Sequence, residues 1–336
     1  MNGKRLIRRG ILILSLVSVS LVQAENIARE DNQPTPQQWL ERMAKSSREL
    51  TYQGDLVYQQ GGLLETLNIA HTVDSEGKEQ ERIIYLDGAP REMVRRDQQL
   101  VFSNYGRVDT RFEHGALMPM LGKFSQGNSI LDYELKIVGL DRVAGRESLL
   151  LMVIPKDRFR YGYQLWLDRA SGLLIKSMMI NDSGQIMERM QFTHLNVGGS
   201  LSKETLSALN KKQGGTDRVV PMEHSDVNEK STLGWETGWV PQGFDLKSRS
   251  KRPSPISNQQ VDALNFSDGI ASFSVFVEPD ETRVLSQASE NIGALAAVSK
   301  VYRDGDKYFH VTVVGEIPLS AAERIAVSVR PVKSDS

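Results

Sequence analysis

The sequence predicts an α+β fold that is mostly antiparallel β-sheet, with a larger β-rich domain followed by a smaller α+β domain. From about residue 50 to residue 195, apolar and polar residues alternate with the period of two that is typical of strands, and Gly, Pro, Asn and Asp interrupt the runs. A second set of alternating runs begins at Gly234, after a polar stretch. Short strands joined by tight turns must be antiparallel, because parallel strands need long crossover connections.

The N-terminus has the pattern of a secretory signal. Four basic residues precede an apolar run at 10–22 that ends in Val22-Gln23-Ala24, and these are Lys4, Arg5, Arg8 and Arg9. As a helix the run would span roughly 20 Å, which is shorter than the roughly 30 Å hydrocarbon core of a membrane. We therefore expect residues 1–24 to be a cleaved signal peptide rather than an anchor. The pair Arg8-Arg9 also suggests twin-arginine export, but no cofactor motif that would require it follows.

The chain of 336 residues contains no cysteine and has a formal net charge of −1. It therefore lacks disulfides and also the lipid-bearing cysteine of bacterial lipoproteins, so we expect a soluble exported protein that depends on its hydrophobic core. The balanced charge indicates no nucleic-acid partner.

The larger domain is expected over residues 25–212. A helix is predicted from Pro36 to about Arg48, with Thr35 as its cap and Gln38 completing a capping box. A short helix is predicted at 202–212, and residues 213–233 lack periodicity and are expected to be an interdomain linker. The candidate strands are YQGDLVY, LLETLNIAHTV, ERIIYL, REMVRR, LVFS, YELKIVGL and SLLLMVI.

The smaller domain is expected over residues 234–330. A capping box from Ser320 to Glu323 predicts the start of a final helix, whose apolar face contains Ile325, Ala326 and Val329. The strands of this domain are predicted near 244–251, 259–267, 270–278, 295–303 and 306–315.

Motifs of catalysis and metal binding are missing from the sequence. It contains no G-x-S-x-G elbow, phosphate-binding glycine loop or H-E-x-x-H motif, and its five histidines lack ligand spacing. His224-Ser225-Asp226 has the residue types of a triad, but its members are contiguous and lie inside the predicted linker. We expect no enzymatic activity, no metal and no cofactor.

Residues 161–179, YGYQLWLDRASGLLIKSMM, predict a hairpin at the centre of the sheet. Asp168 and Gly172 fall at the turn, where glycine can adopt a positive φ. Methionine suits adaptable apolar surfaces, so the aromatic and sulfur-containing residues in and after this hairpin are candidates to line a lipid pocket. Packing against a covering helix is the alternative. These candidates are Trp166, Met178, Met179, Met187 and Met190.

Four stretches resemble one known family. Tyr161-Gly162-Tyr163 followed by LWLDRASGLLIKS is similar to the signature of the RseB/MucB family. GWVPQGF at 238–244, SDGIASFSVFVEP at 267–279 and VTVVGEIPLSAAERIA at 311–326 agree with it, in order and across both predicted domains. The resemblance therefore covers essentially the whole chain after the signal.

The resemblance implies a fold and a function. It implies a larger domain like the lipoprotein carriers LolA and LolB, an incomplete antiparallel barrel with helices over its open side, and a smaller domain that binds an anti-sigma factor. It implies a periplasmic negative regulator of the sigma-E (AlgU-type) envelope stress response, which binds the periplasmic domain of RseA or MucA and shields it from site-1 (DegS-type) proteolysis. Lipopolysaccharide, another acyl chain or mislocalised lipoprotein is implied as the releasing signal. A lipid or lipoprotein carrier without a regulatory role is the alternative.

Two groups in the smaller domain are candidates for partner contacts. Trp235, Trp239 and Phe244 are either core residues or a peptide-facing edge. Lys247, Arg249, Lys251 and Arg252 form a basic cluster that is either a solvated loop or a docking site for an acidic segment or lipid phosphates. The sequence leaves open whether the chain forms a homodimer.

Overall fold

The computed structural model describes residues 34–96, 99–103, 131–210, 218–221, 234–253, 260–280 and 287–332. The chain divides into two units, Met1–Thr35 and Pro36–Ser336, and all of the elements below belong to the second. The expected signal segment at 1–24 lies outside the described residues. None of the helices that the structure describes combines the length and the apolar composition needed to cross a membrane.

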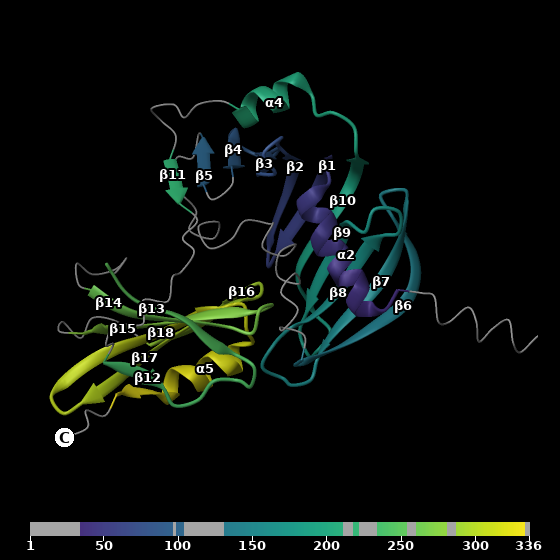
Figure 1. Ribbon diagram of the computed structural model, residues 1–336. Coiled ribbons are helices and arrows are strands. Elements are labelled where there is room, and N and C mark those ends of the chain that lie inside the picture. The colour runs from purple at the N-terminus through teal and green to yellow at the C-terminus, as the bar shows by residue number, and fades with distance from the viewer. Residues whose placement is uncertain are drawn as a thin grey trace, which may run out of the picture. The chain divides into compact units, whose positions relative to one another are not determined.

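An open antiparallel sheet of eleven strands forms the larger domain (Figure 1). Two meanders, β1 to β5 and β6 to β10, join where β1 pairs with β10, and β6 and β11 are the two edges of the strand order. This confirms the predicted fold class of mostly antiparallel strands in a sheet that does not close. The strands are β1 (Tyr52–Gln60), β2 (Leu63–Val73), β3 (Glu79–Tyr85), β4 (Arg91–Arg96), β5 (Gln99–Ser103), β6 (Tyr133–Val143), β7 (Arg146–Pro155), β8 (Gly162–Asp168), β9 (Leu174–Ile180), β10 (Ile186–Val197) and β11 (Arg218–Pro221).

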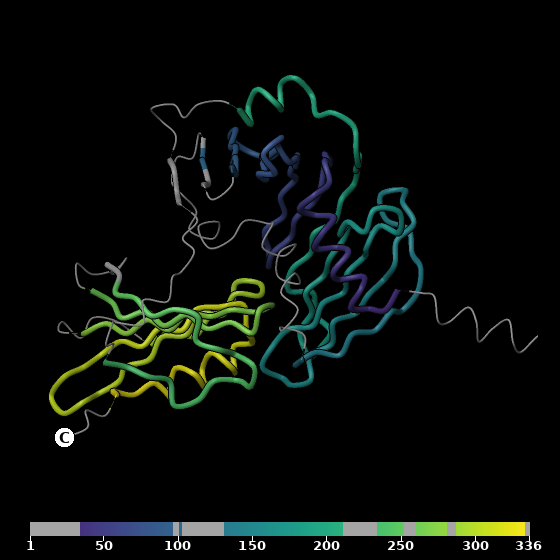
Figure 2. The backbone as a smooth tube through the Cα atoms, viewed as in Figure 1, coloured from purple at the N-terminus to yellow at the C-terminus, as the bar shows by residue number. Residues whose placement is uncertain are grey.

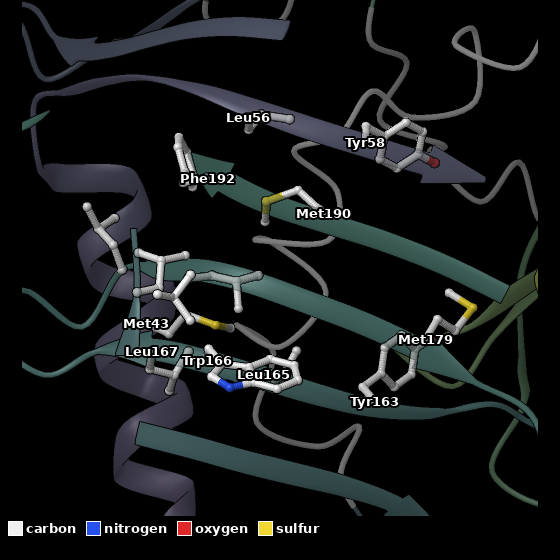
Figure 3. Packing of buried hydrophobic residues seen from close by; sticks show 14 of the residues in the cluster. Met43, Leu56, Tyr58, Tyr163, Leu165, Trp166, Leu167, Met179, Met190 and Phe192 are labelled. Atoms are coloured by element: carbon white, nitrogen blue, oxygen red, sulfur yellow. The ribbon is translucent and has the colours of Figure 1, made fainter. Parts of the chain in front are cut away.

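Helix α2 (Pro36–Glu49) packs its apolar face on this sheet, as its 3.6-residue periodicity predicts. Trp39, Leu40 and Met43 are buried in the same core cluster as the strand residues. Figure 3 shows Met43 of α2 next to Leu167 of β8. The helix is also attached by hydrogen bonds, because its Arg42 and Ser46 donate to the main-chain carbonyls of the β8–β9 turn.

The β8–β9 hairpin confirms the turn predicted within residues 161–179. Asp168 is buried at the end of β8 and accepts hydrogen bonds from Arg146 at 2.8 and 3.0 Å and from the main-chain N–H and hydroxyl of Ser171 at 2.8 and 2.6 Å. Gly172 has a φ of +84°, and a Cβ there would lie 2.7 Å from a side-chain carbon of Arg42. The turn therefore needs glycine for its backbone conformation and for the close approach of α2.

The region between the larger and the smaller domain contains one strand that the sequence does not predict. Helix α4 (Lys203–Asn210) agrees with the predicted helix, and its cap is Ser202, whose Oγ accepts from the N–H of Thr205 at 3.1 Å. Strand β11 lies within the expected linker at 213–233 and pairs with β5. The rest of that linker lies outside the described residues.

The smaller domain is a six-stranded antiparallel sheet with α5 (Leu319–Ser328) along one face (Figure 2). Its buried face and the apolar face of the helix share a core that includes Val275, Val313 and Ile325. Two short strands, β12 (Trp235–Thr237) and β19 (Val329–Pro331), pair with each other in a separate two-stranded sheet. In the sequence, β12 precedes the six strands and β19 follows them. The six strands are β13 (Asp245–Pro253), β14 (Gln260–Ser267), β15 (Ser272–Pro279), β16 (Ala288–Ile292), β17 (Leu295–Asp304) and β18 (Lys307–Gly315).

The predicted capping box at the start of α5 is wrong. The residue before the helix is Pro318, and no side chain caps it. The carbonyl of Pro318 accepts the N–H groups of Ala321 and Ala322, which places Ser320 inside the first turn. Glu323 instead accepts a hydrogen bond from Ser289 at 2.8 Å. Proline is tolerated just before a helix, because an N–H group at this position would have no hydrogen-bond partner within the helix.

The buried Asp168 should contribute more to stability than an exposed ion pair close to it. Asp168→Ala removes a carboxylate that satisfies two partners, so we expect the free energy of unfolding in urea to fall by about 2–4 kcal/mol. Glu147→Ala is the control, because it removes only the exposed partner of Arg169 and should cost less than about 1 kcal/mol. Equal losses for the two variants would contradict this assignment.

Candidate functional site

The five predicted lipid-pocket residues do not line one face of the sheet. Met178 and Met179 are consecutive on β9, so their side chains point to opposite faces. Met179 pairs with Tyr163, whereas Met178 pairs with Gln164, and Trp166 lies two residues further along β8 on the same face as Gln164. Trp166 and Met178 therefore lie on one face of the sheet and Met179 on the other, and the binding of a lipid by any of the five residues remains a prediction.

Trp166 is held as a structural residue on the face that it shares with Met178. Its indole N–H donates to Asp141 at 2.7 Å, and the ammonium group of Lys176 lies 4.2 Å from the centre of its ring. Burial lowers the pKa of Lys176, and the charge of Arg189 lowers it further. These contacts account for the position of the indole without a ligand.

Met179 and Met190 face the inside of the sheet. Met179 is fully buried next to Tyr163, and Met190 lies opposite Tyr58 on the neighbouring strand (Figure 3). Met187, at an irregularity between β9 and β10, is half-buried and packs against the same core. The inner face thus has a flexible, sulfur-rich region, and its capacity to accept an acyl chain remains a prediction.

A row of polar side chains crosses the same inner face further along the sheet. The strand register places Tyr52, His71, Glu81 and Arg95 opposite one another on β1 to β4. Tyr52 and His71 stack with their ring centres 4.9 Å apart, and Arg95 donates to Glu81 at 3.1 Å and to Glu79 at 2.8 Å. Three atoms in this row are buried without a hydrogen-bond partner in the part of the chain that the structure describes, namely Tyr52 Oη, His71 Nε2 and Glu81 Oε1.

The burial of this row shifts its protonation equilibria. Burial raises the pKa of Glu81 from 4.5 to about 7, although Arg95 opposes the shift. Burial lowers the pKa of His71 from 6.5, and the main-chain carbonyl of Leu50 only partly offsets this. A buried carboxyl with so high a pKa costs stability when it ionises, because the native state then holds a charge with incomplete compensation.

Glu81 should therefore make stability depend on pH. A raised pKa in the folded state gives stability that is present in full below about pH 4.5 and lost as the pH rises through about 7. The loss is roughly 3 kcal/mol at full ionisation. We expect Glu81→Gln to flatten the decline in the free energy of unfolding between about pH 5 and pH 8.

Urea titrations of the two proteins across this range provide the test, with the exposed Glu147→Gln as the control. His71 is present in all three proteins, so its opposite contribution cancels in the comparison. A decline in Glu81→Gln as steep as that of the wild type would show that Glu81 does not ionise in this range.

The second notable site is the junction of the two domains, which is built around Arg160. This residue lies in the loop between β7 and β8, and its side chain is fully buried. Its guanidinium donates to Asp157 at 2.9 Å, to Asp268 at 2.8 Å and to the main-chain carbonyl of Gln242. Asp268 and Gln242 belong to the smaller domain, so one side chain of the larger domain binds two segments of the other.

Aromatic rings and a third carboxylate complete the junction. The guanidinium carbon of Arg160 lies 5.4 Å from the ring centre of Tyr133 and 5.1 Å from that of Phe244. The hydroxyl of Tyr133 donates to Asp268 at 3.2 Å, and Asp132 lies 3.6 Å from the guanidinium. The planar, always charged guanidinium suits such a site, because it can donate in several directions while its faces pack on rings.

The pKa values at the junction follow from burial and pairing. Burial lowers the pKa of Arg160, but its hydrogen bond to Asp157 and the nearby charges outweigh this and raise it overall. Burial raises the pKa of Asp268, although the N–H groups of Ala271 and Ile270 favour its charged form. The site is thus a buried ion pair supported by main-chain donors on its acidic side.

Three further close approaches join the same two domains. Tyr161 donates from its hydroxyl to the carbonyl of Ile317 at 3.3 Å. Ile270 and Ala294 of the smaller domain are buried in the core cluster of the larger one. Gly243 has a φ of +82°, and a Cβ there would overlap the carboxylate of Asp132. The junction is therefore packed closely as well as paired electrostatically.

The structure separates the three aromatic candidates of the smaller domain. Trp235 is buried in the core, with its ring centre 4.7 Å from that of Phe309. Phe244 is buried between Phe273 and Arg160, at the junction. Trp239 alone of the three is partly exposed, and its contact with a partner remains a prediction.

The basic cluster follows an edge strand rather than a single surface. All four residues lie on β13, which is an edge of the six-stranded sheet. Lys247 lies 3.3 Å from Asp245 and Lys251 lies 3.8 Å from Asp262, which partly neutralises both. Arg249 is half-buried opposite Leu264, and nothing is described of the Arg252 side chain. Whether these four residues bind a partner remains a prediction.

Sequence reasoning missed Arg160, Asp268 and the loop around them. Arg160 directly precedes the Tyr161-Gly162-Tyr163 motif, and Asp268 lies inside the stretch at 267–279 that resembles the same family. The two motifs therefore marked the position of the junction. The pairing of Arg160 with Asp268 could not be predicted, because no local pattern links residues that lie 108 positions apart. Within the described ranges, no group of three or more His, Asp or Glu residues is arranged to hold a metal ion.

Removal of the Arg160 charge should loosen the junction. Arg160→Met keeps most of the side-chain volume but leaves Asp157 and Asp268 without their shared cation, so we expect a loss of about 3–5 kcal/mol in the stability of the docked arrangement. Urea unfolding should change from one transition to two, and protease should cut faster between the domains. The exposed Arg169→Met is the control, and a single unchanged transition in Arg160→Met would contradict the role of this residue.

Comparisons with known proteins agree with this architecture. The family model for the MucB/RseB N-terminal domain matches residues 35–210, and the model for the MucB/RseB C-terminal domain matches residues 229–330. The sigma factor AlgU regulatory protein MucB of Pseudomonas aeruginosa is 38% identical over 321 residues, which cover 96% of each chain.

Solved structures give the same answer. The structure of the Pseudomonas aeruginosa MucA/MucB complex contains a chain that is 37% identical, with a TM-score of 0.75 over 89% of this chain and 99% of that one. A crystal structure of MucB in complex with MucA(peri) is 36% identical, with a TM-score of 0.73 over 89% of this chain and 100% of that one. The sequence motifs, the two domains and these matches over the full length lead to one conclusion: the chain belongs to the MucB/RseB family.

Proposed function

We propose that this protein regulates an envelope stress sigma factor by binding the periplasmic domain of a MucA-type anti-sigma factor. In this proposal the bound protein shields the anti-sigma factor from a site-1 protease of the DegS type and so keeps the sigma factor inactive. The observation that carries the proposal is the complex of a relative with MucA(peri), which matches this chain through both domains. The name of the 38% identical relative, a sigma factor AlgU regulatory protein, supports it.

The protein would act by binding and not by catalysis. Its sequence contains no G-x-S-x-G elbow, phosphate-binding glycine loop or H-E-x-x-H motif, and its relatives carry names of regulators. The export pattern at residues 1–24 supports action in the periplasm, where the partner domain would be located.

The inner face of the larger domain is the proposed site of a releasing lipid. An acyl chain placed beside Met179, Met187 and Met190 would gain roughly 0.8 kcal/mol for each buried methylene group. If this ligand favours a different arrangement of the two domains, then ligand and anti-sigma factor are linked through one equilibrium. The segment at 213–233 would permit such a rearrangement, and a shortened segment should then abolish release by lipid.

The basic strand is a candidate contact for the partner. Lys247, Arg249, Lys251 and Arg252 lie together on β13, an edge of the six-stranded sheet. Cations near an exposed edge strand attract acidic segments, and the attraction weakens with salt.

Reconstituted proteolysis provides the direct test. The periplasmic domain of the anti-sigma factor, a DegS-type protease and this protein are combined, and the rate of cleavage is measured with and without the protein. We expect an excess of the protein to slow cleavage by at least tenfold and a bound acyl chain or lipopolysaccharide to restore it. Cleavage at an unchanged rate would overturn the proposal. Transfer of labelled lipoprotein between membranes, without such protection, would favour a carrier instead.

A further inference from the structure

An aromatic and cationic patch lies beside the domain junction and involves both domains. Phe159 of the β7–β8 loop and Trp239, which follows β12, meet edge to face, with ring centres 5.0 Å apart and planes at 71°. The guanidinium of Arg324 on α5 lies 3.9 Å from the ring centre of Trp239 and 5.6 Å from that of Phe159. Arg158 lies 5.5 Å from the Phe159 ring. We call these four residues the Arg158–Arg324 patch.

We infer that the Arg158–Arg324 patch docks an acidic segment of the protein partner, with carboxylates on its two arginines and an apolar side chain against its two rings. This inference rests on the proposed function, because it places the anti-sigma factor's periplasmic domain on this particular surface.

The charges of the patch are available to a partner. Arg158 and Arg324 are both exposed, and none of the ion pairs found among the described residues involves either of them. Two other exposed arginines are paired instead, since Arg169 binds Glu147 at 3.0 Å and Arg330 binds Glu236 at 2.9 Å. The two patch guanidiniums instead pack near aromatic rings, which orients them while their N–H donors remain free for bidentate carboxylate binding.

The apolar part of the patch has the composition of an interface centre. Tryptophan and arginine are the residue types that most often dominate binding energy, and aromatic residues are enriched at such sites. Phe159 and Trp239 are only half-buried. One turn beyond Arg324 on the same side of α5, Val327 is 70% exposed and extends the apolar surface. A partner segment with only acidic side chains would make no apolar contact with the two rings. The segment that fits the patch therefore combines carboxylates with an apolar side chain.

The patch also depends on the junction. Phe159 immediately precedes Arg160, and Asp157 accepts both the N–H of Phe159 at 2.8 Å and the guanidinium of Arg160. If the domains separate, Arg158 and Phe159 leave with the larger domain, while Trp239 and Arg324 remain with the smaller one. The partner would therefore bind the docked arrangement more tightly than the separated one, and by linkage it would stabilise that arrangement.

The test measures binding of the full-length protein to the purified periplasmic domain of the anti-sigma factor, across a range of salt concentrations. We expect the double variant Arg158→Gln, Arg324→Gln to weaken binding by tenfold or more and to reduce its dependence on salt. The matched control, Arg169→Gln with Arg330→Gln, removes one exposed arginine from each domain and should bind as the wild type does. Both double variants should unfold at the wild-type urea concentration.

The remaining outcomes separate this inference from the proposed function. A patch variant with wild-type affinity and salt dependence overturns the inference, and Lys247→Glu with Lys251→Glu then tests the basic strand as the site. A wild-type protein that neither binds nor protects the anti-sigma domain overturns the proposed function itself. If the patch variant loses binding to vesicles of anionic phospholipid but retains the protein partner, the patch is a lipid contact and the inference is wrong.

The dependence on the junction has its own measurement. Arg160→Met should weaken binding of the anti-sigma factor's periplasmic domain. When Arg158→Gln and Arg324→Gln are added to Arg160→Met, they should weaken this binding by a smaller factor than they do in the wild-type protein. Fully additive losses would show that the patch and the junction act independently and would overturn the composite surface.

Discussion

The buried guanidinium of Arg160 is the interaction on which the arrangement of the two domains depends. A charge taken out of water is costly, and it persists in a protein interior only when it is paired and its donors are satisfied. Here the compensation comes from Asp157 in the same loop and from Asp268 and the Gln242 carbonyl in the other domain. The guanidinium is thus paired with carboxylates of both domains, because Asp132 of the larger domain also lies 3.6 Å from it. The pairing therefore favours one docked geometry, while its net contribution to the free energy of folding stays modest.

The loop that carries Arg160 also contributes to a neighbouring surface, and a second buried polar group lies elsewhere in the larger sheet. The Asp157 carboxylate that holds Arg160 also accepts the N–H of Phe159, so the loop that completes the junction also presents an aromatic ring to the exterior. On the inner face of the larger sheet, the polar row at Tyr52, His71 and Glu81 has incomplete hydrogen bonding and costs stability near neutral pH. The surrounding apolar core offsets this cost.

Local patterns predicted those features that depend on neighbours in the sequence. The β8–β9 hairpin was predicted from alternation and α2 from helical periodicity, and the structure confirms both, together with the short helix predicted at 202–212, which is α4. The capping box before α5 failed because Pro318 occupies the position just before the helix and its carbonyl receives the first hydrogen bonds. Strand alternation places Met178 and Met179 on opposite faces of the sheet, a constraint already visible in the sequence.

The fold class, most of the helices and strands and the family could be predicted from the chain alone, because periodicity, turn residues and four motif stretches are all local properties of the sequence. The residues that meet at the junction and at the Arg158–Arg324 patch become apparent in the folded chain. Arg160 with Asp268, and Phe159 with Trp239, are far apart in sequence and have no common period. Their pairing follows from the way two separately patterned sheets pack, since that packing buries a charge together with carboxylates of both domains.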